Sequence, residues 1–116
     1  MITRLHENER MAQVVTFGRT IETAGQVAND PTQGIKGQAA QVFATLEQLL
    51  AQAGANKGDL TRVQMWLADM ADFDAMNEVY TQWLADSPKP VRACVGAELV
   101  AGGYLIEVQA FAYRRD

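Results

Sequence analysis

The stretch of residues 34–53 constrains the fold more than any other part of the chain. Its apolar side chains recur at steps of three and four and form one stripe along a helix: Ile35, Ala39, Val42, Phe43, Leu46, Leu49, Leu50 and Ala53. Polar side chains fill the other face: Gln38, Gln41, Glu47, Gln48 and Gln52. The run 29–32, Asn-Asp-Pro-Thr, is typical of a loop and a helix start, and Gly54 suits the left-handed residue that ends a helix. A helix with one apolar face must pack that face against another layer.

The rest of the chain predicts strands and one more helix. Short β-type runs at 14–17 and 19–27, separated by Gly18, predict a hairpin. Residues 60–68 alternate, with Val63, Met65 and Leu67 on one side, which predicts a strand. Asp72 can cap a second helix to about residue 85, and further strands are expected at 91–99 and 104–113. Strand–helix–strand order places both helices on one face of a mixed sheet, so we expect an α+β domain.

Composition narrows the class of protein. A chain of 116 residues predicts a single domain over 1–116, and its open sheet face could be covered by further subunits. The net charge is −4, and the only adjacent basic pair is Arg114-Arg115, so we expect no nucleic-acid partner. No apolar run is long enough for a membrane span, and the polar N-terminus lacks a signal-peptide core. With Cys94 as the one cysteine, a cytoplasmic protein is expected.

The chain has few residues of the types that common metal sites and catalytic nucleophiles require. The chain has one histidine, His6, and one cysteine, which are too few for a typical zinc site. A Ser–His–Asp or Cys–His catalytic arrangement would have to use His6, which lies in the polar N-terminal segment. Gly102-Gly103 has neither the spacing nor the following helix of a phosphate loop. We therefore expect no metal and no cofactor, and chemistry based on arginine, glutamate, cysteine and backbone groups.

The strand around Arg92 is the first candidate site. Alternation puts Arg92, Cys94 and Gly96 on one face and predicts that Val91, Ala93, Val95 and Ala97 form the packed face. A fixed guanidinium beside small residues suits a carboxylate, which arginine can bind through two parallel hydrogen bonds. The alternative is an edge-strand arginine in a surface ion pair.

Three other side chains have alternatives of the same kind. Glu107 shares a face with Gln109, and burial there would raise its pKa and make it a proton acceptor or a water ligand. Equally, it could be a salt-bridge partner. Cys94 could be a small buried hydrophobe. Asn77, next to Met76, could face the rim of the sheet or only solvent.

Several ordered segments together resemble the RidA/YjgF family. They are 90–97, Pro-Val-Arg-Ala-Cys-Val-Gly-Ala; 106–110, Ile-Glu-Val-Gln-Ala; 23–27, Thr-Ala-Gly-Gln-Val; the helix end at 54–55; and 73–80, Phe-Asp-Ala-Met-Asn-Glu-Val-Tyr. The resemblance implies a chorismate-mutase-like fold and a homotrimer with its sheets inside and clefts between subunits. It also implies that the strand at 60–68 lies between the last two strands.

The resemblance implies an activity as well. Similar proteins deaminate reactive enamines and imines, such as 2-aminoacrylate, to the 2-keto acid and ammonia, without a metal or a covalent intermediate. By position, Arg92 would bind the substrate carboxylate, Cys94 would contribute its backbone, and Glu107 would orient the attacking water. Arg92 and Glu107 are the candidate catalytic residues; Arg92, Cys94, Asn77 and Met11 are the candidate substrate-binding residues. Met11 stands where the family has a tyrosine, and Ala24 and Gln109 also depart from its pattern.

Three functions remain open at this point. The first is a cofactor-free deaminase of 2-imino acids. The second is a non-catalytic trimer whose clefts bind keto acids or other small carboxylates. The third is a factor that interacts with protein or RNA, which the acidic composition disfavours as far as RNA is concerned.

Overall fold

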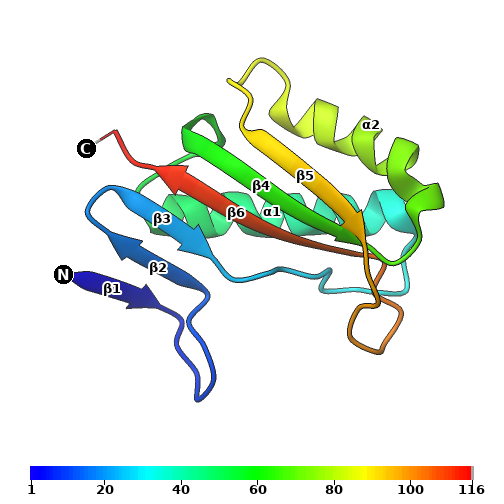
Figure 1. The fold of residues 1–116 in the computed structure, drawn as a ribbon, viewed down its shortest axis with the longest axis horizontal. Helices are drawn as coiled ribbons and strands as arrows, with labels where there is room; N and C mark the ends of the chain where they lie inside the picture. Colours follow the sequence, from blue (N-terminus) through cyan, green and yellow to red (C-terminus); the bar gives the residue numbers. More distant parts are fainter. Residues whose placement is uncertain (116) are drawn as a thin grey trace.

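The computed structural model describes residues 1–115, which form one six-stranded mixed sheet and two α-helices (Figure 1). The strands are Ile2–Leu5 (β1), Val14–Phe17 (β2), Thr20–Thr23 (β3), Leu60–Leu67 (β4), Val91–Gly96 (β5) and Ile106–Tyr113 (β6). The helices are Ile35–Gln52 (α1) and Phe73–Leu84 (α2). Two short 3₁₀ turns flank β4: Lys57–Asp59 (η1) precedes it, and Met70–Asp72 (η2) lies between β4 and α2. The α+β prediction is confirmed.

The strand order is β1-β2-β3-β6-β4-β5. Strand β4 pairs in parallel with β5 and antiparallel with β6, so it separates the last two strands as the family resemblance implied. The predicted hairpin is present as β2 and β3, with Gly18 in the turn at φ 59°. The sequence patterns did not single out β1, because its side chains are almost all exposed and show no buried alternation.

Both helices cover the same face of the sheet, and α1 runs behind β6 and β4 in Figure 1. The core forms where the apolar stripe of α1 meets Val63, Met65 and Leu67 of β4, all fully buried. Burying a side chain of this size contributes about 1.5–3 kcal/mol. The predicted stripe of α1 and the predicted inward side of β4 are therefore confirmed.

The ends of α1 differ in how well they were predicted. The helix begins after Gly34, and no side chain caps its first turn. The carboxylate of Asp30 instead accepts a hydrogen bond from the Thr32 backbone N–H, at 3.0 Å, within the preceding loop. At the other end, Gly54 has φ 86°, and the N–H of Ala55 donates to the carbonyl of Leu50 at 2.8 Å. That pairing closes a helix end in the way expected of a left-handed glycine.

Gln38 is not on the solvent face of α1 as predicted. Its side chain is fully buried, and its Nε2 donates to the carbonyls of Pro31, Gln33 and Gly103 at 2.9–3.1 Å. Its Oε1 accepts from the backbone N–H of Leu105 at 2.9 Å. A buried polar side chain is tolerated when its donors and acceptors are satisfied. Gln38 thus ties two loops to the start of β6.

The predicted packed face of β5 was also wrong for the single chain. Val91 is 70% exposed and Val95 46% exposed, whereas Cys94 packs against the core. The reason is that β5 is an edge strand, and only the face toward α2 has a second layer. The other face of the sheet stays open. Among residues 1–115, no helix is long and apolar enough to cross a membrane.

Candidate functional site

Arg92 lies on β5 and points toward helix α2. In the register of the sheet it stands opposite Val63, on the face that the helices cover. Its Nη1 donates to the Oδ1 of Asn77 at 2.6 Å. Its guanidinium carbon lies 4.8 Å from the ring centroid of Tyr80 and 5.6 Å from that of Phe73. Three side chains of one helix therefore hold this guanidinium.

All three of those partners are uncharged. The ion pairs within residues 1–115 are Lys36–Glu78, Lys57–Glu47 and Arg115–Asp59, and none includes Arg92. The surface ion pair considered above is therefore not formed in this part of the chain. Since the Arg92 side chain is exposed yet held in place, its positive charge is available to an external anion.

Cys94 lies two residues further along β5 on the same face, opposite Met65. Burial raises the pKa of its thiol, and the nearby positive charge of Arg92 opposes this in part. The thiol is therefore mainly protonated at neutral pH, which is the less nucleophilic form. A packing role and a backbone contact suit this cysteine better than covalent chemistry.

Glu107 lies on the opposite face of the sheet. It pairs in register with Trp66 of β4, which in turn pairs with Val95, and these positions face the open side. Gly25 lies against its carboxyl group: a Cβ placed on Gly25 would be 3.0 Å from Cδ of Glu107 and closer still to Oε2. A glycine at this position makes room for the Glu107 carboxyl group.

Met11 belongs to the same region as Gly25. It is 45% exposed in the connection between β1 and β2. Two residues later, Gln13 accepts a side-chain hydrogen bond from Gln26 at 2.7 Å and a backbone hydrogen bond from Ala24 at 2.9 Å. These contacts hold the Met11 loop beside the 24–26 segment, and that segment adjoins Glu107.

One chain thus carries two separate groups of candidate residues. We call Arg92, Asn77 and Cys94 the arginine half-site, and Glu107, Gly25 and Met11 the glutamate half-site. They lie on opposite faces of the sheet, with β4 between β5 and β6. The predicted site residues are therefore only partly brought together. Within residues 1–115, no three histidine, cysteine or acidic side chains lie close enough to hold a metal ion.

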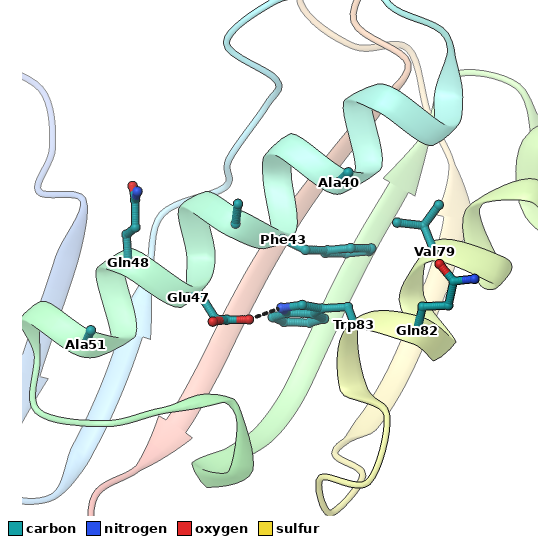
Figure 2. Close-up of a pocket in the computed structure, with 9 residues that line it drawn as sticks. Ala40, Phe43, Glu47, Gln48, Ala51, Val79, Gln82 and Trp83 are labelled. Carbon is teal, nitrogen blue, oxygen red and sulfur yellow. Dashed lines mark hydrogen bonds between the residues drawn. The ribbon is translucent and has the colours of Figure 1, made fainter.

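Sequence reasoning assigned Phe73 and Tyr80 only to the core, and it missed their contact with Arg92. The spacing of Phe73, Asn77 and Tyr80 was the available signal, because residues four and seven apart share one face of a helix. Further along α2, Trp83 stacks on Phe43 of α1 (Figure 2). Both rings line a groove between the two helices with a volume of about 640 Å³.

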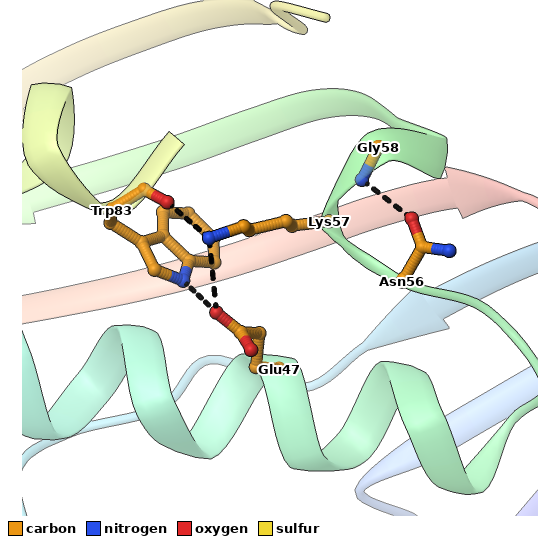
Figure 3. Close-up of polar contacts among 5 residues, drawn as sticks. All are labelled: Glu47, Asn56, Lys57, Gly58 and Trp83. Atoms are coloured by element: carbon orange, nitrogen blue, oxygen red, sulfur yellow. Dashed lines mark hydrogen bonds and ion pairs between the residues drawn. The ribbon is translucent and has the colours of Figure 1, made fainter. Parts of the chain in front are cut away.

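An ion pair and two hydrogen bonds secure this part of α2. The Nε1 of Trp83 donates to the Oε1 of Glu47 at 2.6 Å (Figure 3). Lys57, from η1, donates to the backbone carbonyl of Trp83 and pairs with the same Glu47 oxygen at 3.6 Å. The helix that holds Arg92 is thereby fastened to α1. No motif in the sequence pointed to Glu47 or Lys57, since the two are joined only by the fold.

The fold and the arginine half-site define a small α+β protein with an exposed guanidinium, held by uncharged side chains, at the edge of its sheet. Known proteins share this architecture over the full chain. The model of the family described as Endoribonuclease L-PSP matches residues 1–114. A RutC family protein of Pyrococcus abyssi is 36% identical over 109 residues, which cover 89% of this chain and 85% of that protein.

Two further relatives agree with this assignment. The mitochondrial protein mmf1 of Schizosaccharomyces pombe is 35% identical over 107 residues, which cover 86% of this chain and 65% of that protein. The crystal structure of a YjgF family member from Neisseria meningitidis is 29% identical, with a TM-score of 0.96, over 100% of this chain and 97% of that one. The chain belongs to the YjgF/RidA family.

Proposed function

We propose that this protein hydrolyses 2-imino acids, formed from enamines such as 2-aminoacrylate, to 2-keto acids and ammonia without a cofactor. The observation that carries the proposal is the Arg92 guanidinium, held by Asn77, Tyr80 and Phe73 with no carboxylate partner in residues 1–115. Such a group suits the carboxylate that every 2-imino acid carries. Family membership supports the same chemistry.

The reaction needs little beyond positioning. Arg92 binds the substrate carboxylate, and Glu107 accepts a hydrogen bond from a water aimed at the imine carbon. The water oxygen bonds to that carbon while Glu107 takes up a proton and passes it to the nitrogen. The hydroxyl proton of the tetrahedral intermediate then moves to the amino nitrogen, the C–N bond breaks, and ammonia and the keto acid are released. Holding the reactants in a productive geometry supplies most of the acceleration.

The proposed site lies between two chains. Because the two half-sites face opposite sides of one sheet, one substrate cannot contact both in the same subunit. A cleft in which the arginine half-site of one subunit meets the glutamate half-site of the next meets this requirement. The open sheet face, with exposed Val91 and Val95, supports burial between subunits, and a homotrimer is the proposed assembly.

Arg92→Ala is expected to lower kcat/KM for imino-acid hydrolysis roughly 10- to 100-fold, since hydrogen bonds to a charged group contribute about 1.5–3 kcal/mol. Arg92→Lys should restore only part of it, because lysine cannot form the two parallel hydrogen bonds. An amino-acid oxidase can generate the imino acids while a trapping amine competes for them. Arg115→Ala, an exposed arginine paired with Asp59, is the matched control. Full activity in Arg92→Ala would disprove the assigned role.

Gly25→Ala is expected to disturb Glu107 while leaving the fold intact. The added methyl group would overlap the end of a flexible side chain, which can swing away at little cost in stability. Activity should fall about tenfold or more, toward the level of Glu107→Gln, because the water would lose its acceptor. Melting temperature and hydrolysis rate are the two measurements. Wild-type activity in Gly25→Ala would show that the position of the Glu107 carboxyl group does not matter for the reaction.

The second candidate is a non-catalytic trimer that binds keto acids in the same clefts. The exposed thioether of Met11 favours it, since the glutamate half-site then lacks a phenol hydroxyl at that position. Melting shifts with keto acids but no turnover of small, branched or aromatic imino acids would select this function. The family description mentions an endoribonuclease, but the net charge of −4 and the pairing of Lys36, Lys57 and Arg115 with carboxylates disfavour RNA here.

A further inference from the structure

Arg92 needs a means of keeping one orientation. It is an exposed side chain on an edge strand, and a free arginine of this kind has many rotamers to lose on binding a ligand. The hydrogen bond to Asn77 fixes one nitrogen only. The remaining contacts of the guanidinium are with ring faces, of which that of Tyr80, at 4.8 Å, is closer than that of Phe73, at 5.6 Å.

Tyr80 is itself held by the core. Its ring meets Phe43 edge to face at a centroid distance of 5.7 Å, and Phe43 is only 1% exposed. Trp83 lies 6.2 Å from Tyr80 and stacks on Phe43 at 4.7 Å with the rings 7° from parallel. Figure 3 shows how Glu47 and Lys57 in turn hold Trp83 in place. The ring beneath Arg92 therefore rests on a rigid base.

The ring of Tyr80 matters more here than its hydroxyl. Within residues 1–115, the influences on the Tyr80 hydroxyl are burial and the charge of Arg92, with no hydrogen bond among them. Burial raises the pKa of this phenol, although Arg92 opposes the shift, so the group is neutral at physiological pH. A neutral ring attracts the guanidinium through its π-face, and phenylalanine would offer nearly the same face.

We propose that Tyr80 is a positioning residue, whose ring holds the Arg92 guanidinium in the orientation that receives the substrate carboxylate. The inference rests on the proposed function for its kinetic consequence, but the contact itself does not depend on turnover. Loss of the ring should raise KM about fivefold or more and leave kcat nearly unchanged, since carboxylate binding weakens while the attacking water is untouched. Tyr80→Phe should behave as the wild type.

The experiment compares wild type with Tyr80→Phe, Tyr80→Leu and Tyr80→Met, with Val79→Ala on the neighbouring position of α2 as the control. Kinetics give KM and kcat separately, and pyruvate titration gives carboxylate affinity without turnover. The ¹H–¹⁵N signal of the Arg92 side chain, assigned by its loss in Arg92→Lys, reports ring-current shielding by Tyr80. We expect shielding in wild type and Tyr80→Phe, and its loss together with weaker pyruvate binding in Tyr80→Leu and Tyr80→Met.

The outcomes separate this inference from the proposed function. An unshielded Arg92 signal in wild type, or unchanged pyruvate affinity in a folded Tyr80→Leu or Tyr80→Met variant, would overturn the role of Tyr80. An unshielded wild-type signal rejects the contact even if both variants fail to fold. Shielding and ring-dependent pyruvate binding without any hydrolysis would leave Tyr80 in its role and reject the deaminase.

Discussion

Replacing Gln38 by leucine is expected to lower the free energy of unfolding by about 2–4 kcal/mol. The substitution removes every hydrogen bond of a fully buried amide: those to the carbonyls of Pro31, Gln33 and Gly103, and that from the N–H of Leu105. Leucine has a similar volume and creates no large cavity. The loss therefore comes from backbone groups left without partners and from loops no longer joined to the start of β6.

Urea unfolding at fixed protein concentration measures this effect, since an associating protein has a concentration-dependent midpoint. Gln48→Leu is the matched control, because Gln48 is an exposed glutamine on the same helix. Its unfolding free energy should change by only about 0.5 kcal/mol. Equal effects of the two substitutions would show that the Gln38 hydrogen bonds do not stabilise the fold.

Mixing two variants of low activity is expected to give a hydrolysis rate clearly above that of either variant alone. Arg92→Ala lacks the arginine half-site and Glu107→Gln lacks the glutamate half-site. In mixed trimers, the intact Arg92 of one chain can face the intact Glu107 of another. With equal amounts and random association, about a quarter of the clefts would then be complete.

Coexpression of the two variants, or refolding them together, provides the exchange of chains, and the hydrolysis rate per chain is the measurement. Each variant refolded alone is the control and should stay at its own low rate. A mixture no more active than the mean of its components would mean that Arg92 and Glu107 act within one chain. The opposite orientation of the two side chains on the sheet would then need another explanation.

Local patterns predicted the elements that bury one regular face. The stripe of α1 and the alternation of β4 are repeated at the period of each structure, so the side that faces the core could be recognised from the sequence. The position of β4 between β5 and β6 could not be obtained in this way. Pairing between distant strands leaves no local period, and only the resemblance to a family indicated it.

The errors concern residues whose environment depends on distant neighbours. Gln38 was predicted to be exposed because it is polar, yet two of its four partners, Gly103 and Leu105, lie far along the chain. Alternation in β5 separates Arg92 from Val91 but does not say which side has a second layer. Asn77 and Tyr80 were found near Arg92 only once α2 was placed against the sheet.

The open face of the sheet also bears on how sequence variation in such a chain should be interpreted. The core beneath α1 is formed by residues of one chain alone. A substitution at Val95 or Trp66 on the open face could then leave folding intact and still prevent association. With the proposed site between subunits, variants of this kind would be folded chains without function, and stability measured on single chains would not identify them.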